Sequence, residues 1–262
     1  MRQFVVTVTP DEAELAADAL WGLGVVAVEE RALDDGTIEL WTSLGDDADV
    51  DMPQLPWPAR FEEVDATVAD TWRQFAEPIN VDHDLVVQPA WVAFSPDQGT
   101  TVLVIEPGAT FGMGDHPTTR LTLVAARRWV RADTRVLDVG CGSGVLAIGC
   151  MVFGAASAVG IDIAPAAVPV TLENARANNV EVAVSTTPLE EVEGEYDLVL
   201  ANILAPALVA LAPHLRRVLA PGGTLVVSGI LAGSHQHVLD ALAPLHPVRT
   251  DVLDGWAAVT LR

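Results

Sequence analysis

Two hydrophobic periods alternate along the chain from residue 135 onward. Short apolar runs, typical of buried strands, are separated by stretches in which apolar residues recur every three or four positions, as on a helix face. The predicted strands are 135–139, 157–161, 181–184, 196–201, 223–228, 248–253 and 257–261, and the predicted helices are 144–153, 166–178, 204–219 and 234–243. This alternation predicts an α/β fold, a doubly wound and mostly parallel sheet whose last two strands, around the turn LDGW, form an antiparallel hairpin. Pro169 falls inside a predicted helix, which therefore begins later or bends there.

A smaller α+β pattern precedes this region. Alternation predicts strands at 3–9, 24–30 and 37–43, and helical spacing behind Pro10 predicts a helix over 11–22. An acidic, proline-rich connector, a short helix around Trp72 and two strand-like stretches, LVVQPAWV and TTVLVIE, lead into the glycine-rich loop PGATFGMGDHPTT and a helix near 120–131. We therefore predict three parts: a small domain at 1–60, a linker and lead-in segment at 61–106, and the α/β domain at 107–262.

The amino-acid composition indicates the cellular compartment and the kind of binding partner. Cys141 and Cys150 lack CxxC spacing and suit a reducing cytosol, and the early acidic residues are unlike a signal peptide. No uncharged apolar run reaches the ~18 residues of a membrane helix, so we expect a cytoplasmic protein without membrane contact. The net charge is −22, and all 14 basic residues are arginine. Such a field repels nucleic acid and attracts a basic partner, although an acidic proteome or a salty cytoplasm explains it equally well.

The most informative motif is VLDVGCGSG at residues 136–144, an apolar strand that ends in three alternating glycines. Gly140, Gly142 and Gly144 allow positive φ angles and let a ligand approach the backbone. Asp162 follows Gly140 by 22 positions, at the end of the next predicted strand. A glycine turn with an acid at that distance is how doubly wound folds hold a nucleoside ribose, so the site predicts a ligand built on adenosine.

The residues around these glycines discriminate between two classes of adenosine cofactor, a dinucleotide and one without phosphate. A dinucleotide site requires glycine or alanine at the third position of its motif, where this chain has Val145. Asp138 lies beside the same turn, where a carboxylate disfavours a pyrophosphate but suits the ammonium group of an amino acid. S-adenosylmethionine (SAM) carries that ammonium and a sulfonium charge and has no phosphate. SAM is therefore the expected cofactor, and a nicotinamide-dependent oxidoreductase is the disfavoured alternative.

Asn202, in the stretch DLVLANILA, is predicted at the carboxyl end of a buried strand, where ligands bind in open α/β sheets. Its amide oxygen accepts a hydrogen bond without carrying charge, so it can hold an amine nucleophile beside a methyl donor. The competing interpretation is that Asn202 caps the following helix.

Six stretches of the chain resemble a known protein family. The stretches PGATFGMGDHPTTRLTL, VLDVGCGSGVLAIGC, VGIDIAPAAV, LENARANN, YDLVLANILAPAL and PGGTLVVSGIL are similar to the bacterial ribosomal protein L11 methyltransferase (PrmA) family of SAM-dependent methyltransferases. The resemblance extends to the linker WRQFAEPINVDHDLVVQPAW and to the N-terminal region. It implies a Rossmann-like seven-stranded methyltransferase domain behind a small substrate-recognition domain. It also implies a protein N-methyltransferase acting on lysine and α-amino groups of ribosomal protein L11.

The resemblance also implies which residues form the site. The cofactor pocket would contain Thr119, Gly140, Asp162 and Asn202, with Gly142 and Gly144 shaping the turn, Phe111 lining the pocket and Leu189 on the adenine side. Asn202 would orient the amine as the catalytic residue, and His116 is a candidate proton acceptor by location alone. No metal is expected.

Three departures from the family bear on the substrate. Asp115 replaces a common threonine, and Pro206 begins the helix after Asn202, where proline is tolerated. Between Ser43 and Phe61 a proline-rich stretch stands where the family has a second helix. The alternatives are thus a methyltransferase for another protein or a small molecule, and a SAM-binding interaction module without catalysis.

Overall fold

The computed structural model describes residues 2–21, 23, 25, 28–33, 35–42, 44, 52–63, 76–106 and 114–262. The chain divides into two compact units, Met1–Ala76 and Glu77–Arg262. The helix expected around Trp72 lies outside the described residues. Among the helices that are described, none has the length and hydropathy needed to cross a membrane.

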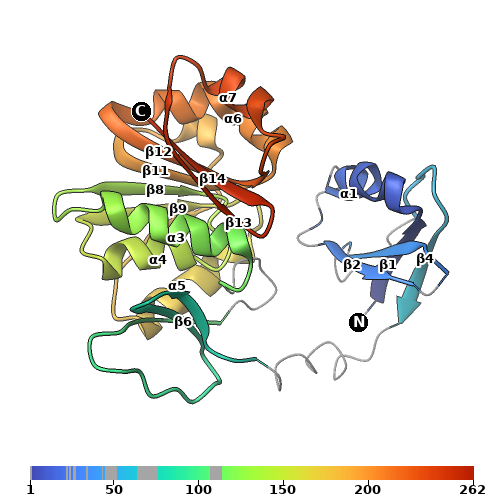
Figure 1. The fold of residues 1–262 in the computed structure, drawn as a ribbon, viewed down its shortest axis with the longest axis horizontal. Coiled ribbons are helices and arrows are strands. Elements are labelled where there is room, and N and C mark those ends of the chain that lie inside the picture. The colour runs from blue at the N-terminus through green and yellow to red at the C-terminus, as the bar shows by residue number, and fades with distance from the viewer. Residues whose placement is uncertain are drawn as a thin grey trace. The chain divides into compact units, whose positions relative to one another are not determined.

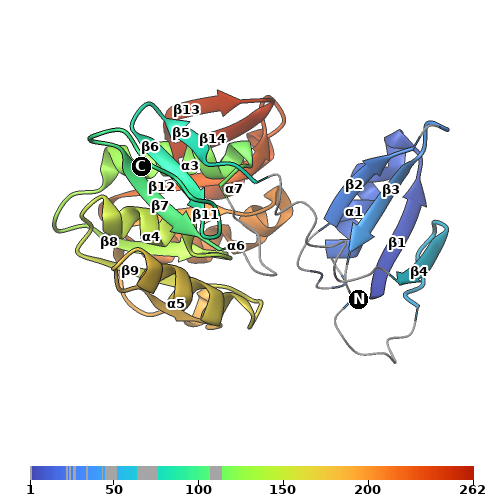
Figure 2. The same ribbon diagram turned by 90° about the horizontal axis from the view of Figure 1, so that it is seen from below.

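The N-terminal unit is a four-stranded antiparallel sheet with a helix packed on it (Figure 2). Its strands are β1 (Arg2–Val8), β2 (Val28–Ala32), β3 (Ile38–Thr42) and β4 (Ala59–Glu63), and they lie side by side in the order β2–β3–β1–β4. Between β1 and β2 the chain forms the 3-10 turn η1 (Pro10–Glu12) and the helix α1 (Ala13–Trp21). Alternate residues of a strand face the same side, so Phe4 and Leu40 are fully buried against Leu20 of α1. The Thr9 hydroxyl and amide both donate to the Glu12 carboxylate, which caps the start of the helical segment.

Strand β4 was missed by the sequence analysis, which assigned its residues to the connector and linker. Ala59 and Phe61 alternate with charged residues, and Phe61 pairs with Phe4 of β1 at a ring-centroid distance of 5.2 Å. The predicted boundary at residue 60 therefore cuts through a strand of the first unit. The five-residue run follows several prolines, which hid its period. In the stretch 43–61, where the sequence lacks a helix of the family, the described residues 44 and 52–61 contain no helix.

The second unit contains the seven-stranded sheet that the hydrophobic pattern predicts, in the order β10–β9–β8–β11–β12–β14–β13 (Figure 1). Its strands are β8 (Arg135–Val139), β9 (Ser157–Ile161), β10 (Ala183–Ser185), β11 (Tyr196–Asn202), β12 (Leu219–Leu231), β13 (Pro247–Leu253) and β14 (Trp256–Leu261). Its helical elements are α3 (Pro117–Trp129), α4 (Val145–Val152), α5 (Ala167–Ala177), η3 (Leu189–Glu191), α6 (Ala205–Arg217) and α7 (Gln236–Leu242). Only the pairs made by β14 are antiparallel in this sheet. The predicted doubly wound α/β class is confirmed, and the final hairpin places β14 between β12 and β13.

Helices cover both faces of this sheet, because successive strand residues point to opposite sides. Val136 of β8 belongs to the apolar cluster under α3 and α4, whereas its neighbour Leu137 belongs to the cluster under α6 and α7. Both side chains are fully buried. The strands are therefore apolar along nearly their whole length, which is why they were predicted from sequence.

A three-stranded sheet of β5 (Ile79–Asp82), β6 (Leu85–Pro89) and β7 (Thr101–Ile105) packs on α3 and α4 (Figure 2). Leu85, Leu103 and Ile105 are fully buried in the same cluster as those helices. The predicted boundary at residue 106 therefore separates these strands from the unit to which they belong. Their position brings the end of β7 close to α5.

From the sequence, Pro169 was expected to delay or bend its helix, but α5 continues through it. Helix α5 begins at Ala167, so Pro169 lies in the first turn, where backbone amides have no partner within the helix. Pro206 occupies a first-turn position of α6 in the same way, as expected.

Candidate active site

The strand register places three predicted site residues in one row at the carboxyl edge of the sheet. Val139 of β8 pairs with Ile161 of β9 on one side and with Ala201 of β11 on the other. The next residue of each strand is therefore Gly140, Asp162 or Asn202. Because ligands bind at the carboxyl ends of strands in open α/β sheets, this row forms one edge of a candidate site.

The glycine turn is fastened to the end of β9 by backbone and carboxylate hydrogen bonds. The amides of Gly140 and Cys141 donate to the Ile161 carbonyl at 2.8 and 3.0 Å. The Gly142 amide donates to Oδ2 of Asp162 at 2.8 Å, and the Ala164 amide donates to Oδ1 at 2.9 Å. The Asp162 carboxylate is thus held at the edge with both oxygens oriented by backbone amides.

Close packing explains why this turn needs glycine. Gly140 has a φ of 74°, and a Cβ there would lie 2.4 Å from Cγ2 of Ile203. Gly142 and Gly144 also have positive φ angles, as predicted. The Thr171 hydroxyl of α5 donates to the Gly142 carbonyl at 3.0 Å, which fastens the turn to a second element.

Asp138 is buried behind the turn and is fully inaccessible to solvent. Its Oδ2 accepts a hydrogen bond from the Ala147 amide in the first turn of α4 at 3.1 Å, whereas Oδ1 has no partner among the described residues. Burial raises the pKa of this carboxyl to about 7, and the nearby negative charge of Asp162 adds to the rise. Asp138 therefore also ties the start of α4 to β8, a role that the sequence did not suggest.

The start of α3 adds a buried hydroxyl and a capped helix. Thr119 is 1% exposed, and its Oγ1 has no hydrogen-bond partner among the described residues. His116 is the N-cap of α3: its ring nitrogen Nδ1 lies 2.7 Å from the Thr118 hydroxyl and accepts from the Thr118 amide at 3.3 Å. The ring also packs edge-on against Trp256, and burial lowers the pKa of His116 against the opposing effect of Asp115. These contacts favour a structural role for His116.

The remaining predicted residues differ in what the structure shows. Phe111 lies outside the described residues. Leu189 begins η3 and is 3% exposed, with its carbonyl bound by Arg217 Nη2 at 2.8 Å. Ile163, which the sequence analysis did not select, is 91% exposed directly after Asp162. The sequence signal that could have identified Ile163 is an apolar residue directly after the acid Asp162 at the end of a strand.

Two asparagines of LENARANN connect α5 to the C-terminal end of β7, which sequence reasoning also missed. Asn174 accepts from the Glu106 amide and donates to the Glu106 carbonyl, both at 2.8 Å, and donates to the Ser143 carbonyl at 2.9 Å. Asn178 makes the same paired contacts with the backbone of Val104, at 2.8 and 2.7 Å. Asn174 thereby links the end of the lead-in strands to the glycine turn.

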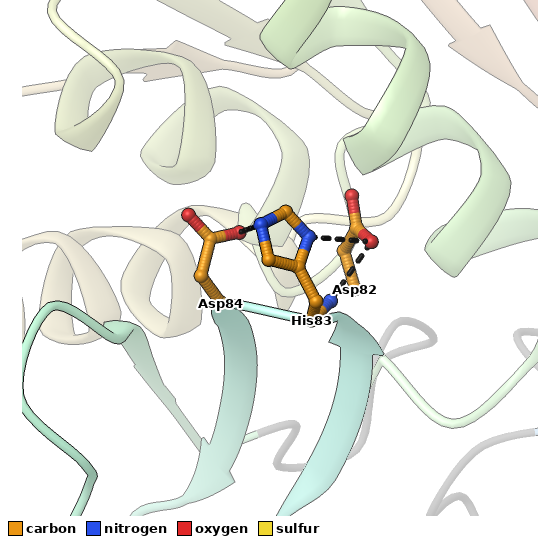
Figure 3. Close-up of side chains that lie close together, drawn as sticks. All are labelled: Asp82, His83 and Asp84. Atoms are coloured by element: carbon orange, nitrogen blue, oxygen red, sulfur yellow. Dashed lines mark hydrogen bonds and ion pairs between the residues drawn. The ribbon is translucent and has the colours of Figure 1, made fainter.

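A separate cluster of possible metal ligands lies in the turn between β5 and β6. Asp82, His83 and Asp84 bring ligand atoms within 4.8 Å of one another (Figure 3). Both carboxylate oxygens of Asp84 accept hydrogen bonds from Arg127, at 2.6 and 2.7 Å, and this guanidinium lowers the pKa of Asp84. Because Arg127 already neutralises that carboxylate, we interpret the cluster as an anchor of the turn.

A cavity of about 570 Å³ opens at the opposite edge of the seven-stranded sheet, beside Arg135 and Asp197 at the start of β8 and β11. Arg135 donates to both oxygens of Asp197, at 3.0 and 3.1 Å. The cavity therefore lies away from the carboxyl ends of the strands, where this fold binds ligands.

The sheet order, the hairpin-inserted strand β14 and the glycine turn define the Rossmann-like, seven-stranded methyltransferase fold. The family model described as ribosomal protein L11 methyltransferase (PrmA) matches residues 59–262. The chain belongs to this family.

Individual relatives agree with this assignment. A ribosomal protein L11 methyltransferase of Ralstonia pickettii is 35% identical over 98% of this chain and 97% of its own. One of Geobacter metallireducens is 46% identical over 66% of this chain, which spans 57% of that relative's length. The crystal structure of a ribosomal protein L11 methylase from Lactobacillus delbrueckii subsp. bulgaricus has a TM-score of 0.67 and 31% identity, covering 71% of this chain and 98% of that one.

Proposed function

We propose that this chain is a SAM-dependent methyltransferase that methylates amines, lysine side chains and α-amino groups, of ribosomal protein L11 in the cytoplasm. The observation that carries the proposal is the single row of Gly140, Asp162 and Asn202 at the carboxyl edge of the sheet. The named substrate of its relatives in the L11 methyltransferase family supports the same activity.

The polar groups at this edge fit SAM better than a dinucleotide. Two buried polar atoms, Asp138 Oδ1 and Thr119 Oγ1, have no partner within the described residues, and such groups normally have one. A carboxyl group at Asp138 beside the turn suits a nearby ammonium group better than a pyrophosphate, whereas Asp162 at the end of β9 suits the ribose of either cofactor. Asp162 is oriented to accept from ribose hydroxyls, and the exposed Ile163 offers an apolar surface to the adenine. Phe111 and Leu189 remain proposed contacts of the same cofactor.

Bound SAM would supply a methyl group already activated by its sulfonium, so the chain's own task is mainly to position the acceptor and exclude water. Asn202 would accept a hydrogen bond from the amine and orient its lone pair toward the methyl group. A lysine amine, with an ordinary pKa of about 10.4, must first lose a proton. A neutral amide favours this better than a carboxylate, because it does not stabilise the ammonium form.

Charge favours a basic protein as the partner. The net charge of −22 would attract a basic ribosomal protein and repel RNA and DNA, so we propose no direct nucleic-acid contact. The four-stranded sheet of the N-terminal unit supplies a structured surface for recognition, in spite of the departure in residues 43–61.

The test is incubation of the chain with SAM and purified L11, read by mass spectrometry for whole methyl increments on lysines and the N-terminus. Asn202→Ala and a reaction without SAM serve as controls. The proposal is supported if L11 is methylated by the wild-type chain with SAM and is not methylated in the two controls. SAM binding without transfer to L11, but with transfer to another component of a ribosomal protein mixture, indicates a different substrate, and binding without any transfer indicates a non-catalytic module. Calorimetric binding of NAD in place of SAM would contradict the cofactor assignment.

A further inference from the structure

The residue that follows Asn202 lies between two glycines from neighbouring strands. Gly140 follows β8, and Gly229 belongs to β12, and β11 lies between those strands in the sheet. A Cβ on Gly140 would lie 2.4 Å from Cγ2 of Ile203. A Cβ on Gly229 would lie 2.4 Å from the carbonyl oxygen of Ile203 and 2.8 Å from its carbonyl carbon. The approach of Ile203 therefore requires glycine on both sides.

The two contacts differ in kind. The Gly140 contact is with a side chain, which can turn to another rotamer. The Gly229 contact is with backbone atoms of Ile203, one residue from Asn202, and no rotamer change relieves it. Gly229 therefore constrains the backbone position of Ile203 more strictly than Gly140 does. Because Asn202 is the preceding residue, the same constraint acts on the position of its Cβ atom.

Gly229 lies in an irregular part of β12. The register between β12 and β14 shifts between Val227 and Ile230, and Gly229 has a φ of 83°. Ser228, the preceding residue, pairs with Asn202 and donates its hydroxyl to the Ala257 carbonyl at 2.8 Å. Such bulges bend a strand and redirect the residues beside a site. The irregularity is thus fixed to β14 on one side and in contact with the Asn202 segment on the other.

We propose that Gly229 is a positioning residue for methyl transfer. It allows the backbone of Ile203 to approach β12 and thereby fixes where the Asn202 amide lies at the sheet edge. This inference rests on the proposed function, because it requires Asn202 to orient the amine. Gly229 itself touches neither the amine nor the cofactor in this scheme.

The test compares Gly229→Ala with Gly233→Ala. Gly233 has a φ of 84°, and a Cβ there would meet nothing within 4 Å, so the two variants share the backbone strain but only the first presses on Ile203. The SAM dissociation constant of both variants, measured by calorimetry, is expected to stay within about threefold of wild type, whereas kcat of Gly229→Ala falls about 10²-fold, the scale of a small misplacement. The kcat value is calculated per SAM-binding site. Equal kcat values for the two variants overturn the positioning role.

A second pair of variants covers the case in which Gly229→Ala does not fold. Ile203→Gly frees the backbone next to Asn202, and Ile203→Val keeps the β-branched side chain and Cγ2. We expect a kcat at least about tenfold lower for Ile203→Gly with unchanged SAM affinity, and a kcat near wild type for Ile203→Val. Equal kcat values for wild type and Ile203→Gly overturn the inference. Absence of methyl transfer by the wild-type chain instead contradicts the proposed function itself.

Discussion

The carboxylate of Asp162 accepts a hydrogen bond from the amide of Gly142 over 2.8 Å and so joins the end of β9 to the glycine turn after β8. Its second oxygen accepts from the Ala164 amide. Within the described part of the chain, two backbone amides therefore orient this carboxylate, one on each oxygen.

Replacing Asp162 by alanine removes both this anchor and the proposed ribose acceptor. Hydrogen bonds to a charged group contribute about 1.5–3 kcal/mol, so SAM affinity should fall roughly 10–100-fold. Calorimetric titration measures the change, and Asp97→Ala, at an exposed loop position, is the control for loss of a negative charge. Unchanged SAM affinity in Asp162→Ala would remove the residue from the cofactor site.

Replacing Asn202 by alanine should separate binding from turnover. Asn202 lines the proposed cofactor pocket, but its main proposed task is to orient the amine, so the SAM dissociation constant should change little while kcat falls about 10²-fold. Steady-state methyl transfer and calorimetry give the two values. Asn80→Ala, at an exposed position of β5, is the matched control. Equal losses of affinity and turnover would argue against an orienting role.

Asp138 predicts a pH dependence of stability. Its pKa is raised by burial from 3.8 to about 7, so between these values the folded state keeps a proton that the unfolded state has lost. This contribution is fully present below pH 3.8 and is lost as the pH rises toward and past 7. Over that range the wild type should lose up to about 4 kcal/mol of unfolding free energy relative to Asp138→Asn, which cannot ionise.

Urea unfolding at a series of pH values measures this difference. Asp133→Asn, at an exposed position, controls for the change in net charge and should follow the wild-type profile. Parallel profiles for wild type and Asp138→Asn would show that Asp138 does not hold the proton.

Asn174 and Asn178 form a matched pair that separates stability from cofactor binding. Both hydrogen-bond a strand backbone, but only Asn174 also donates to the Ser143 carbonyl in the glycine turn. Alanine at either position should lower the unfolding free energy by about 2–4 kcal/mol, because partly buried backbone groups lose their partners. Only Asn174→Ala should also weaken SAM binding, by several-fold. Equal SAM affinities in the two variants would show that the turn keeps its shape without Asn174.

The second unit was largely predictable, and particular residues show why. The strands β8, β9 and β11 are mostly apolar, and the glycines after β8 and Asp162 after β9 follow them directly, so one local segment contains each signal. β4 was missed because a five-residue strand of exposed and partly buried residues is too short to show its period beside prolines. His116 was proposed from its place in the loop, and only the folded structure showed its ring capping α3.

The sequence alone determined the α/β class, the order of the strands and α-helices from residue 135 onward and the glycine turn after β8, because strand and helix periods and glycine turns depend on neighbouring residues. The tertiary structure decided the insertion of β14 between β12 and β13, the burial of Asp138 and the contact of Asn174 with Glu106. It also decided the position of Ile203 between Gly140 and Gly229. These features join residues far apart in the chain, and they follow from which strands lie side by side and in which register.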